Sequence, residues 1–267
     1  MGDEWDILGA KFVNHYASLR GRVRTHVIDR HLAQHLAPAP ASVVDVGGGA
    51  GHQSLPLARR GYDVTLVDPS PAMLARAKRA LGGQPAEVAS RIALVEASAA
   101  EAPAALGGQR FTAVLCHGVI MYVEDPRALV STLASLLEPG GIVSIVAKNA
   151  AALACRPAAR GDWAEALRSF STRRQLGGLG VDTRADTVGE IEGMLEEAGV
   201  TTLDWYGVRL FTDGWAPDRP RRDPEATVLA VELEASRRDP YRALSRLLHI
   251  VGRRPTEEPQ GPASSCM

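Results

Sequence analysis

An acid followed by a run of glycines is the stretch of this sequence with the clearest chemical meaning. Apolar residues at 43, 44 and 46 indicate a buried strand, and Asp45 is followed by four glycines, Gly47, Gly48, Gly49 and Gly51. Glycine lets a backbone approach a ligand because no Cβ stands in between, and the helical pattern from His52 would point N–H groups at the same place. Strand, glycine turn and helix together predict a nucleotide-type pocket.

The spacing of the glycines distinguishes between ligands. A dinucleotide site needs G-x-G-x-x-G, whose third glycine lets the helix pack closely on the strand. Counted from Gly49 and Gly51 the third position is Ser54, and counted from Gly47 and Gly49 it is His52, so that fingerprint fails in both registers. An acid two residues before the first glycine resembles the pattern of S-adenosylmethionine-dependent methyltransferases, where it can help to hold the cationic ammonium group of the cofactor.

Polar side chains at the ends of further strands extend the same site. Asp68 ends the second strand, where an acid can accept hydrogen bonds from two ribose hydroxyls; the alternative is a helix cap, for which Ser70 is better placed. After the third strand, the backbone of Ala99 or the side chain of Glu101 could meet an adenine. His117 ends the fourth strand, where ligands bind in parallel sheets, and the alternative is a histidine satisfied by its own neighbours.

The elements that must position these residues alternate along the chain. Apolar strands separated by helical patterns are typical of a parallel sheet that is covered on both faces. The sequence predicts an α/β, Rossmann-like doubly wound fold with a mostly parallel seven-stranded sheet. The first five strands are expected at 42–46, 63–67, 92–96, 111–117 and 142–147, and the later segments 202–211, 226–237 and 241–252 supply the last strands and a helix.

Three segments fall outside this alternation. Residues 1–37 are expected to be a helical segment before a methyltransferase domain at 38–254. Residues 149–182 are predicted to be an inserted helical cap over the active-site edge, ending in a glycine loop at 177–180. Residues 255–267 are rich in Pro, Glu and Ser and are expected to be disordered.

The composition of the chain limits which binding partners, metals and cellular compartments are compatible with it. The net charge of −1 leaves no overall basic field, so any contact with nucleic acid must come from a local patch. The three cysteines show neither metal-ligand spacing nor a disulfide framework, which suits a reducing cytoplasm. The N-terminus lacks the apolar region of a signal peptide, and no run approaches transmembrane length. We therefore expect a cytoplasmic protein without a metal or a membrane anchor.

Segments outside the core match one family in order and spacing. The chain to about Pro255 is similar to the bacterial tRNA 5-carboxymethoxyuridine methyltransferases, which use S-adenosylmethionine to methylate the carboxylate on a modified wobble uridine. The matching segments are Arg20-Gly21-Arg22-Val23-Arg24, Lys148-Asn149-Ala150, Gly207-Val208-Arg209-Leu210-Phe211, and Asp239-Pro240-Tyr241-Arg242 running to His249-Ile250-Val251.

The resemblance implies S-adenosylmethionine as cofactor and tRNA, through its anticodon region, as partner. It assigns Arg24 to the carboxylate of the cofactor, Asp68 to its ribose and Ala99 to its adenine region. The remaining cofactor contacts that it implies come from Gly47, Gly48 and His117, the last of which also lies by the substrate.

A carboxylate acceptor requires positive groups but no general base, because it is already ionised at neutral pH. We therefore assign no catalytic residue. Each candidate for the substrate has a plainer alternative, a solvated arginine or a packed aromatic ring. The candidates are Arg156, Arg174, Arg209 and Arg246 for an acceptor carboxylate or a phosphate, and Tyr122, Trp163 and Tyr241 for stacking on a base.

Two other functions stay open. A small-molecule methyltransferase of secondary metabolism would share the core, and the near-neutral charge favours it. So does one departure from the family, because scattered arginines replace a lysine-rich insertion. A second departure is Ala50, which stands where an acid is usual. A protein that binds the cofactor without catalysis would keep Asp45 and Asp68 equally well.

Overall fold

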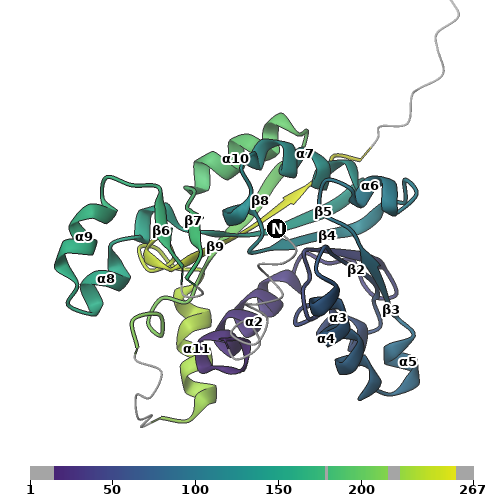
Figure 1. The fold of residues 1–267 in the computed structure, drawn as a ribbon, viewed down its shortest axis with the longest axis horizontal. Coiled ribbons are helices and arrows are strands. Elements are labelled where there is room, and N and C mark those ends of the chain that lie inside the picture. The colour runs from purple at the N-terminus through teal and green to yellow at the C-terminus, as the bar shows by residue number, and fades with distance from the viewer. Residues whose placement is uncertain (1–14, 178–179, 216–222, 257–267) are drawn as a thin grey trace, which may run out of the picture.

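A seven-stranded sheet forms the centre of the computed structural model, which describes residues 15–177, 180–215 and 223–256 (Figure 1). The strand order is β3-β2-β1-β4-β5-β9-β8, and β9 alone runs antiparallel to its neighbours. The predicted mostly parallel seven-stranded sheet is confirmed. Its strands are β1 (Ser42–Val46), β2 (Asp63–Asp68), β3 (Ile92–Glu96), β4 (Phe111–His117), β5 (Leu137–Lys148), β8 (Thr201–Val208) and β9 (Leu247–Arg253).

Helices cover both faces of the sheet because successive strand residues point to opposite sides. Val44 of β1 packs in a core cluster with α7 and α10, whereas its neighbour Val43 packs in another with α2 and α3. The longer helices are α2 (Leu19–Leu32), α3 (Ser54–Arg59), α4 (Pro71–Gly82), α7 (Pro126–Ser135), α10 (Val188–Glu197) and α11 (Glu225–Ala235), which lies beside α2 (Figure 1). The short ones are α5 (Ala86–Ala89), α6 (Ala102–Ala105), η1 (Ile120–Tyr122) and η3 (Arg242–Leu244).

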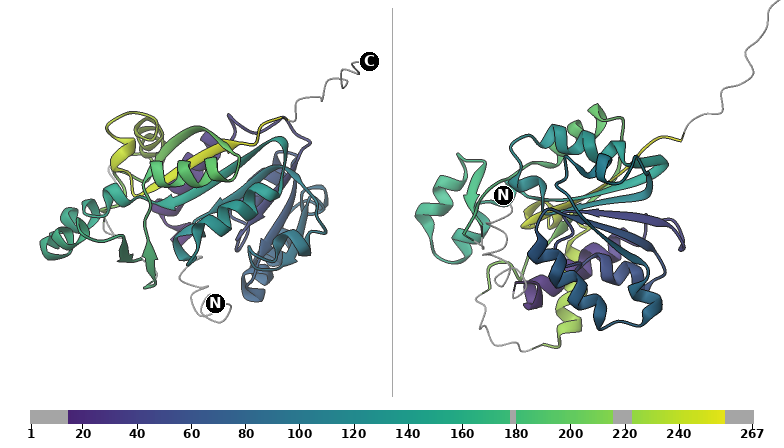
Figure 2. Two further views of the ribbon diagram at one scale, coloured as in Figure 1. Left: turned by 90° about the horizontal axis from the view of Figure 1, so that it is seen from above. Right: turned by 45° about the vertical axis from the view of Figure 1, so that its right-hand side comes forward.

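The inserted cap stands apart from the sheet at one end of the molecule (Figure 2). It begins as predicted with helical turns, η2 (Ala150–Ala152), α8 (Cys155–Ala159) and α9 (Trp163–Ser169). The prediction of a helical cap is wrong for its second half, which is an antiparallel pair of strands, β6 (Arg174–Leu176) and β7 (Asp182–Arg184). A cross-strand ion pair, Arg174 Nε to Asp182 Oδ2 at 2.6 Å, and the buried ammonium of Lys148 stabilise this pairing.

Four expectations concern the two ends of the chain, a membrane and a metal. The predicted disorder of the tail and part of the predicted N-terminal helical segment fall on 257–267 and 1–14, outside the described residues. Within the described part of the chain, no helix combines the length and apolar character needed to cross a bilayer. The same residues gather no group of three His, Cys, Asp or Glu side chains that could hold a metal ion.

Candidate active site

A cavity of about 330 Å³ opens where β1, β2 and β4 end, and we call it the glycine-loop cavity. The carboxyl ends of parallel strands meet at one edge of a sheet, so residues far apart in the sequence come together there. The structure places every residue that the sequence assigned to the cofactor along its wall: Arg24, Asp45, Gly47, Gly48, Gly49, Asp68, Ala99 and His117. Glu101, the alternative to Ala99, instead accepts hydrogen bonds from Ser98.

Two glycines of the turn have no room for a side chain. Gly47 has a φ of +73°, and a Cβ there would lie 2.3 Å from Cγ2 of Val119. A Cβ on Gly48 would lie 2.9 Å from the carboxyl group of Asp45. The glycines therefore let the turn lie directly against the carboxyl group and the cavity.

Asp45 is a buried carboxyl group with few partners. It is 2% exposed, and Oδ2 accepts a hydrogen bond from Ser54 Oγ at 2.7 Å. Burial raises the pKa of Asp45 to about 6, although the bond from Ser54 opposes the shift. Such a carboxylate is stabilised by a positive group that enters the cavity.

Asp68 links the glycine turn to the second strand. Its Oδ2 accepts a hydrogen bond from Gly49 N at 2.8 Å, and its Oδ1 accepts one from Ser70 N at 2.9 Å. Ser70 caps α4 with its own hydroxyl, as the sequence predicted, which leaves Asp68 free of that role. A carboxylate has about four lone-pair sites, so two remain for hydroxyl donors in the cavity.

Arg24 and His117 lie side by side at the inner end of the cavity. Arg24 is buried on α2, and its Nη2 donates to the backbone oxygen of His117 at 3.0 Å. Nε2 of His117 lies 2.8 Å from Oγ of Ser144, which lies 2.8 Å from Nε2 of His249. Burial and then the charge of Arg24 lower the pKa of His117 to about 3, so its imidazole is neutral and a weak base at physiological pH.

A second cavity, of about 180 Å³, adjoins the first and is strongly basic; we call it the arginine cavity. It shares Tyr16, Arg24, His117, Gly118 and Tyr122 with the glycine-loop cavity. None of the described residues that line it is an aspartate or a glutamate. Its cationic residues come from α2, the end of β5, the cap and the loops on either side of α11: Arg20, Arg24, Lys148, Arg156, Arg209 and Arg246.

Lys148 is the most deeply buried of these cations. It is 2% exposed at the end of β5, and its Nζ donates to the backbone oxygen of Gln175 at 3.0 Å and to Thr183 Oγ1 at 2.8 Å. Burial, and then the nearby charge of Arg246, lower the pKa of Lys148 to about 7. An anion that binds beside Lys148 therefore raises this pKa and keeps the ammonium group protonated.

Comparisons with known proteins show the family to which the chain belongs. A family described as methyltransferase domain matches residues 44–145. The tRNA 5-carboxymethoxyuridine methyltransferase of Escherichia coli K12 is 30% identical over 256 residues, which cover 94% of this chain and 96% of that protein. The chain belongs to the same family, the S-adenosylmethionine-dependent methyltransferases.

Solved structures of other methyltransferases share the fold of this methyltransferase. Magnesium protoporphyrin IX methyltransferase of Synechocystis PCC 6803, solved with bound S-adenosylhomocysteine, has a TM-score of 0.65 at 14% identity and covers 95% of this chain and 97% of its own. A putative methyltransferase of Haloferax volcanii, solved with the activator Trm112, has a TM-score of 0.63 at 19% identity, covering 97% of this chain and 99% of its own. The cofactor of this methyltransferase is S-adenosylmethionine.

The residues predicted to bind substrate separate into two groups. Tyr122, Arg156, Arg209 and Arg246 line the arginine cavity of the methyltransferase. Arg174 lies instead on the exposed β6–β7 pair, where Asp182 neutralises it, and Tyr241 packs beside Phe211 with ring centroids 6.2 Å apart. Trp163 is 70% exposed on α9 and lines none of the cavities described here.

Sequence reasoning missed two cations of the arginine cavity. Arg20 lies one helical turn before Arg24 on α2, so the spacing of four residues could have placed both on one face. Lys148 ends a buried strand, as His117 does, and that position was the available signal. The motifs that carry the family resemblance contain both residues.

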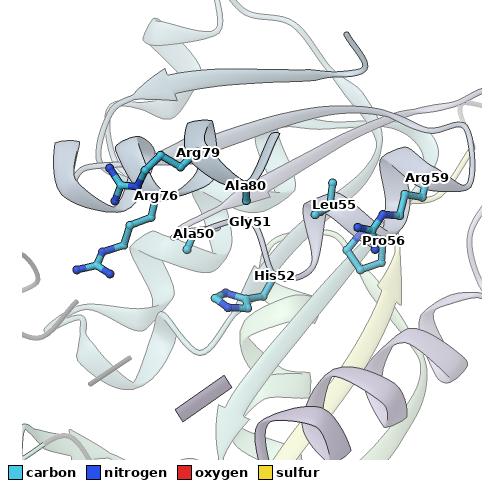
Figure 3. A pocket seen from close by; sticks show the side chains of 9 residues that line it. All are labelled: Ala50, Gly51, His52, Leu55, Pro56, Arg59, Arg76, Arg79 and Ala80. Atoms are coloured by element: carbon cyan, nitrogen blue, oxygen red, sulfur yellow. The ribbon is translucent and has the colours of Figure 1, made fainter. Parts of the chain in front are cut away.

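A further hollow, of about 430 Å³, lies on the outer side of the glycine turn between α3 and α4 (Figure 3). Arg76 and Arg79 extend to the same side of α4, and Arg59 lies across the hollow near Pro56 (Figure 3). His52 lines both this hollow and the glycine-loop cavity. The hollow contains none of the predicted cofactor residues, and its three arginines form a basic surface beside the methyltransferase site.

Proposed function

We propose that this methyltransferase transfers a methyl group to the carboxylate of 5-carboxymethoxyuridine at the wobble position of tRNA. The arginine cavity is the observation that carries the proposal. The described residues on its wall include six cations and no acid, directly beside the cavity for the cofactor. The E. coli relative, which matches over nearly the whole chain, is named for this acceptor.

The glycine-loop cavity fits S-adenosylmethionine group by group. We assign Asp45 to the ammonium group, Arg24 to the carboxylate and Asp68 to the ribose hydroxyls, since each has the required charge and unused hydrogen-bonding capacity. Met73 and Ala99 give the cavity an apolar wall for the adenine. When bound, the cofactor supplies an electrophilic methyl group.

The residues around the acceptor hold and orient it. A carboxylate gives up no proton when it is methylated, so the neutral, weakly basic His117 is no obstacle. The cations hold the carboxylate in place, and Tyr122 lies where a base can contact its ring, at the junction of the two cavities. Arg59, Arg76 and Arg79 add a basic surface for phosphates of a polynucleotide. We place this reaction in the cytoplasm.

The direct test is methyl transfer to tRNA. Purified protein, labelled S-adenosylmethionine and tRNA that carries 5-carboxymethoxyuridine are incubated together, and the tRNA is digested to nucleosides. We expect label in the methyl ester of the modified uridine and none in tRNA with unmodified uridine at that position. Absence of the ester would refute the proposal.

A small acidic metabolite is the second candidate acceptor, since the arginine cavity suits any carboxylate. The two candidates differ in their dependence on salt. A polynucleotide acceptor loses affinity steeply as salt rises, because counterions are released from several phosphates, whereas a single carboxylate loses little. Competition between tRNA and small acids at 50 and 200 mM salt separates them.

Lys148 makes acceptor binding sensitive to pH. Its pKa of about 7 in the free protein is expected to rise when an anionic acceptor binds, so binding takes up a proton above pH 7. We expect KM for the acceptor to be constant from pH 5.5 to 6.5 and to rise by up to about tenfold per pH unit above 7. Lys148→Met should raise KM and remove this slope, whereas Lys78→Met, at an exposed site on α4, should leave the slope in place. A slope that survives in Lys148→Met would contradict the assignment.

The protonation of Asp45 is expected to give cofactor affinity the opposite dependence on pH. Its pKa of about 6 falls when a cationic ammonium group binds, so binding releases a proton below pH 6. We expect the Kd for S-adenosylmethionine, measured by calorimetry, to rise by up to about tenfold per unit as the pH falls from 6 to 5. Asp45→Asn should bind weakly at pH 7.5 with a flat profile. Asp63→Asn, at the exposed start of β2, is the control.

A further inference from the structure

Three arginines separate the arginine cavity from a fourth hollow of about 420 Å³, which we call the outer cavity. Arg156, Arg209 and Arg246 line both. The cap and the segments that precede and follow α11 provide the other walls of the outer cavity, chiefly Ala152, Cys155, Leu210, Phe211, Trp215 and Leu244. The three arginines therefore form the boundary between the two cavities.

The three arginines share a single carboxylate. Nη2 of Arg209 donates to Oδ1 of Asp213, and Nε of Arg156 and Nε of Arg246 lie 3.8 and 3.9 Å from its Oδ2. Burial raises the pKa of Asp213, but the three positive charges outweigh burial and hold that pKa below its usual range. Arg209 and Arg246 are only 6% and 7% exposed. One negative charge among three buried or half-buried positive ones leaves an excess that an anion would compensate.

The backbone of Arg209 adopts a strained conformation. Its φ of +65° makes it the one non-glycine residue with a positive φ in the described parts of the chain. The surrounding backbone is fixed, because Arg246 N donates to its oxygen at 3.0 Å and Glu232 accepts hydrogen bonds from Leu210 N and Thr212 N. Its buried Nε has no hydrogen-bond partner among the described residues. Strain that the surrounding structure maintains, together with a buried N–H donor that lacks an acceptor, indicates a ligand-binding position.

The far side of the outer cavity offers flat apolar surface. The ring of Phe211 is 43% exposed, and Tyr241 packs beside it. Leu244 adds a further exposed apolar side chain at 47%. Exposed aromatic surface next to buried arginines is the combination that binds a nucleotide, with the base on the ring and the phosphate on the cations.

We propose that Arg156, Arg209 and Arg246 bind the phosphate that joins the acceptor nucleotide to its neighbour, and that the neighbouring nucleotide enters the outer cavity. This inference rests on the proposed function, because it requires a nucleotide acceptor. One phosphodiester brings a single negative charge and offsets part of the excess of two positive charges that Asp213 leaves on these arginines. The substrate is then an oligonucleotide, and a free nucleoside fills only one of the two cavities.

The test compares acceptors of increasing size. The probes are 5-carboxymethoxyuridine nucleoside and trinucleotides centred on it, with a phosphodiester or a neutral methylphosphonate at either flanking linkage. We expect kcat/KM for the trinucleotide to exceed that for the nucleoside at least about tenfold, since one stacked base alone supplies such a factor. A methylphosphonate at one of the two linkages should remove most of this advantage. Phe211→Ala should lower the trinucleotide-to-nucleoside ratio about tenfold.

The control variant is Phe170→Ala, because Phe170 is 80% exposed at the end of α9 and lines none of the four cavities described. It should leave the ratio unchanged. Equal kcat/KM for nucleoside and trinucleotide, or a ratio that neither methylphosphonate nor Phe211→Ala alters, would overturn the second nucleotide site while leaving the proposed function intact. Failure to methylate any probe, including whole tRNA that carries the modified base, would overturn both.

Discussion

Asp68→Ala is expected to weaken the binding of S-adenosylmethionine at least about 100-fold, because two hydrogen bonds to a charged group are lost together. The carboxylate of Asp68 is 7% exposed, and backbone amides of Gly49 and Ser70 fix both of its oxygens at 2.8 and 2.9 Å. A carboxylate fixed in this way loses little further conformational entropy when it binds the ribose hydroxyls. Its removal also releases the amide of Gly49, so the glycine turn loses its fixed position.

Calorimetric titration with S-adenosylhomocysteine measures the effect. The matched control is Asp63→Ala, which removes an exposed acid from the other end of the same strand, where it pairs with Arg91 at 2.8 Å. Comparing 5′-methylthioadenosine with its 2′-deoxy analogue isolates the ribose contact. We expect the unaltered protein to prefer the ribose form and Asp68→Ala to show no preference. A variant that keeps the preference would show that another group binds the hydroxyls.

The sheet and the glycine-loop cavity could be predicted from the sequence because local signals determine them. Asp45, Asp68 and His117 each end an apolar run, and the ends of parallel strands meet at one edge whatever the intervening loops do. Arg24 and Ala99 came from family resemblance rather than from periodicity. The structure brings all of them to one cavity.

The arginine cavity could be predicted only in part, because it depends on contacts between distant segments. Arg156 and Arg174 belong to the same insertion and look alike in the sequence, yet only Arg156 faces the cavity. The difference arises where the cap changes from helix to paired strands, and those strands are too short to show an alternating pattern. Lys148 fixes that pair through Gln175 and Thr183, a long-range contact that local propensity cannot reveal.

Arg24 is within reach of both the cofactor and the acceptor, because it lines both the glycine-loop cavity and the arginine cavity. We expect Arg24→Ala to raise the Kd for S-adenosylmethionine about 30-fold, the size of a charge-assisted bidentate contact with the cofactor carboxylate. The matched control is Arg22→Ala on the same helix. Arg22 is exposed and pairs with Glu225 at 2.6 Å, so its removal should leave the Kd within about twofold.

Decarboxylated S-adenosylmethionine separates a direct contact of Arg24 from an indirect one. If Arg24 binds the cofactor carboxylate, the unaltered protein should prefer the carboxylated cofactor about 30-fold and Arg24→Ala should bind both forms alike. A variant that weakens both forms equally would mean that Arg24 acts through its hydrogen bond to His117 and its packing on Tyr16. A variant with normal cofactor affinity but a raised KM for the acceptor would move Arg24 to the acceptor carboxylate.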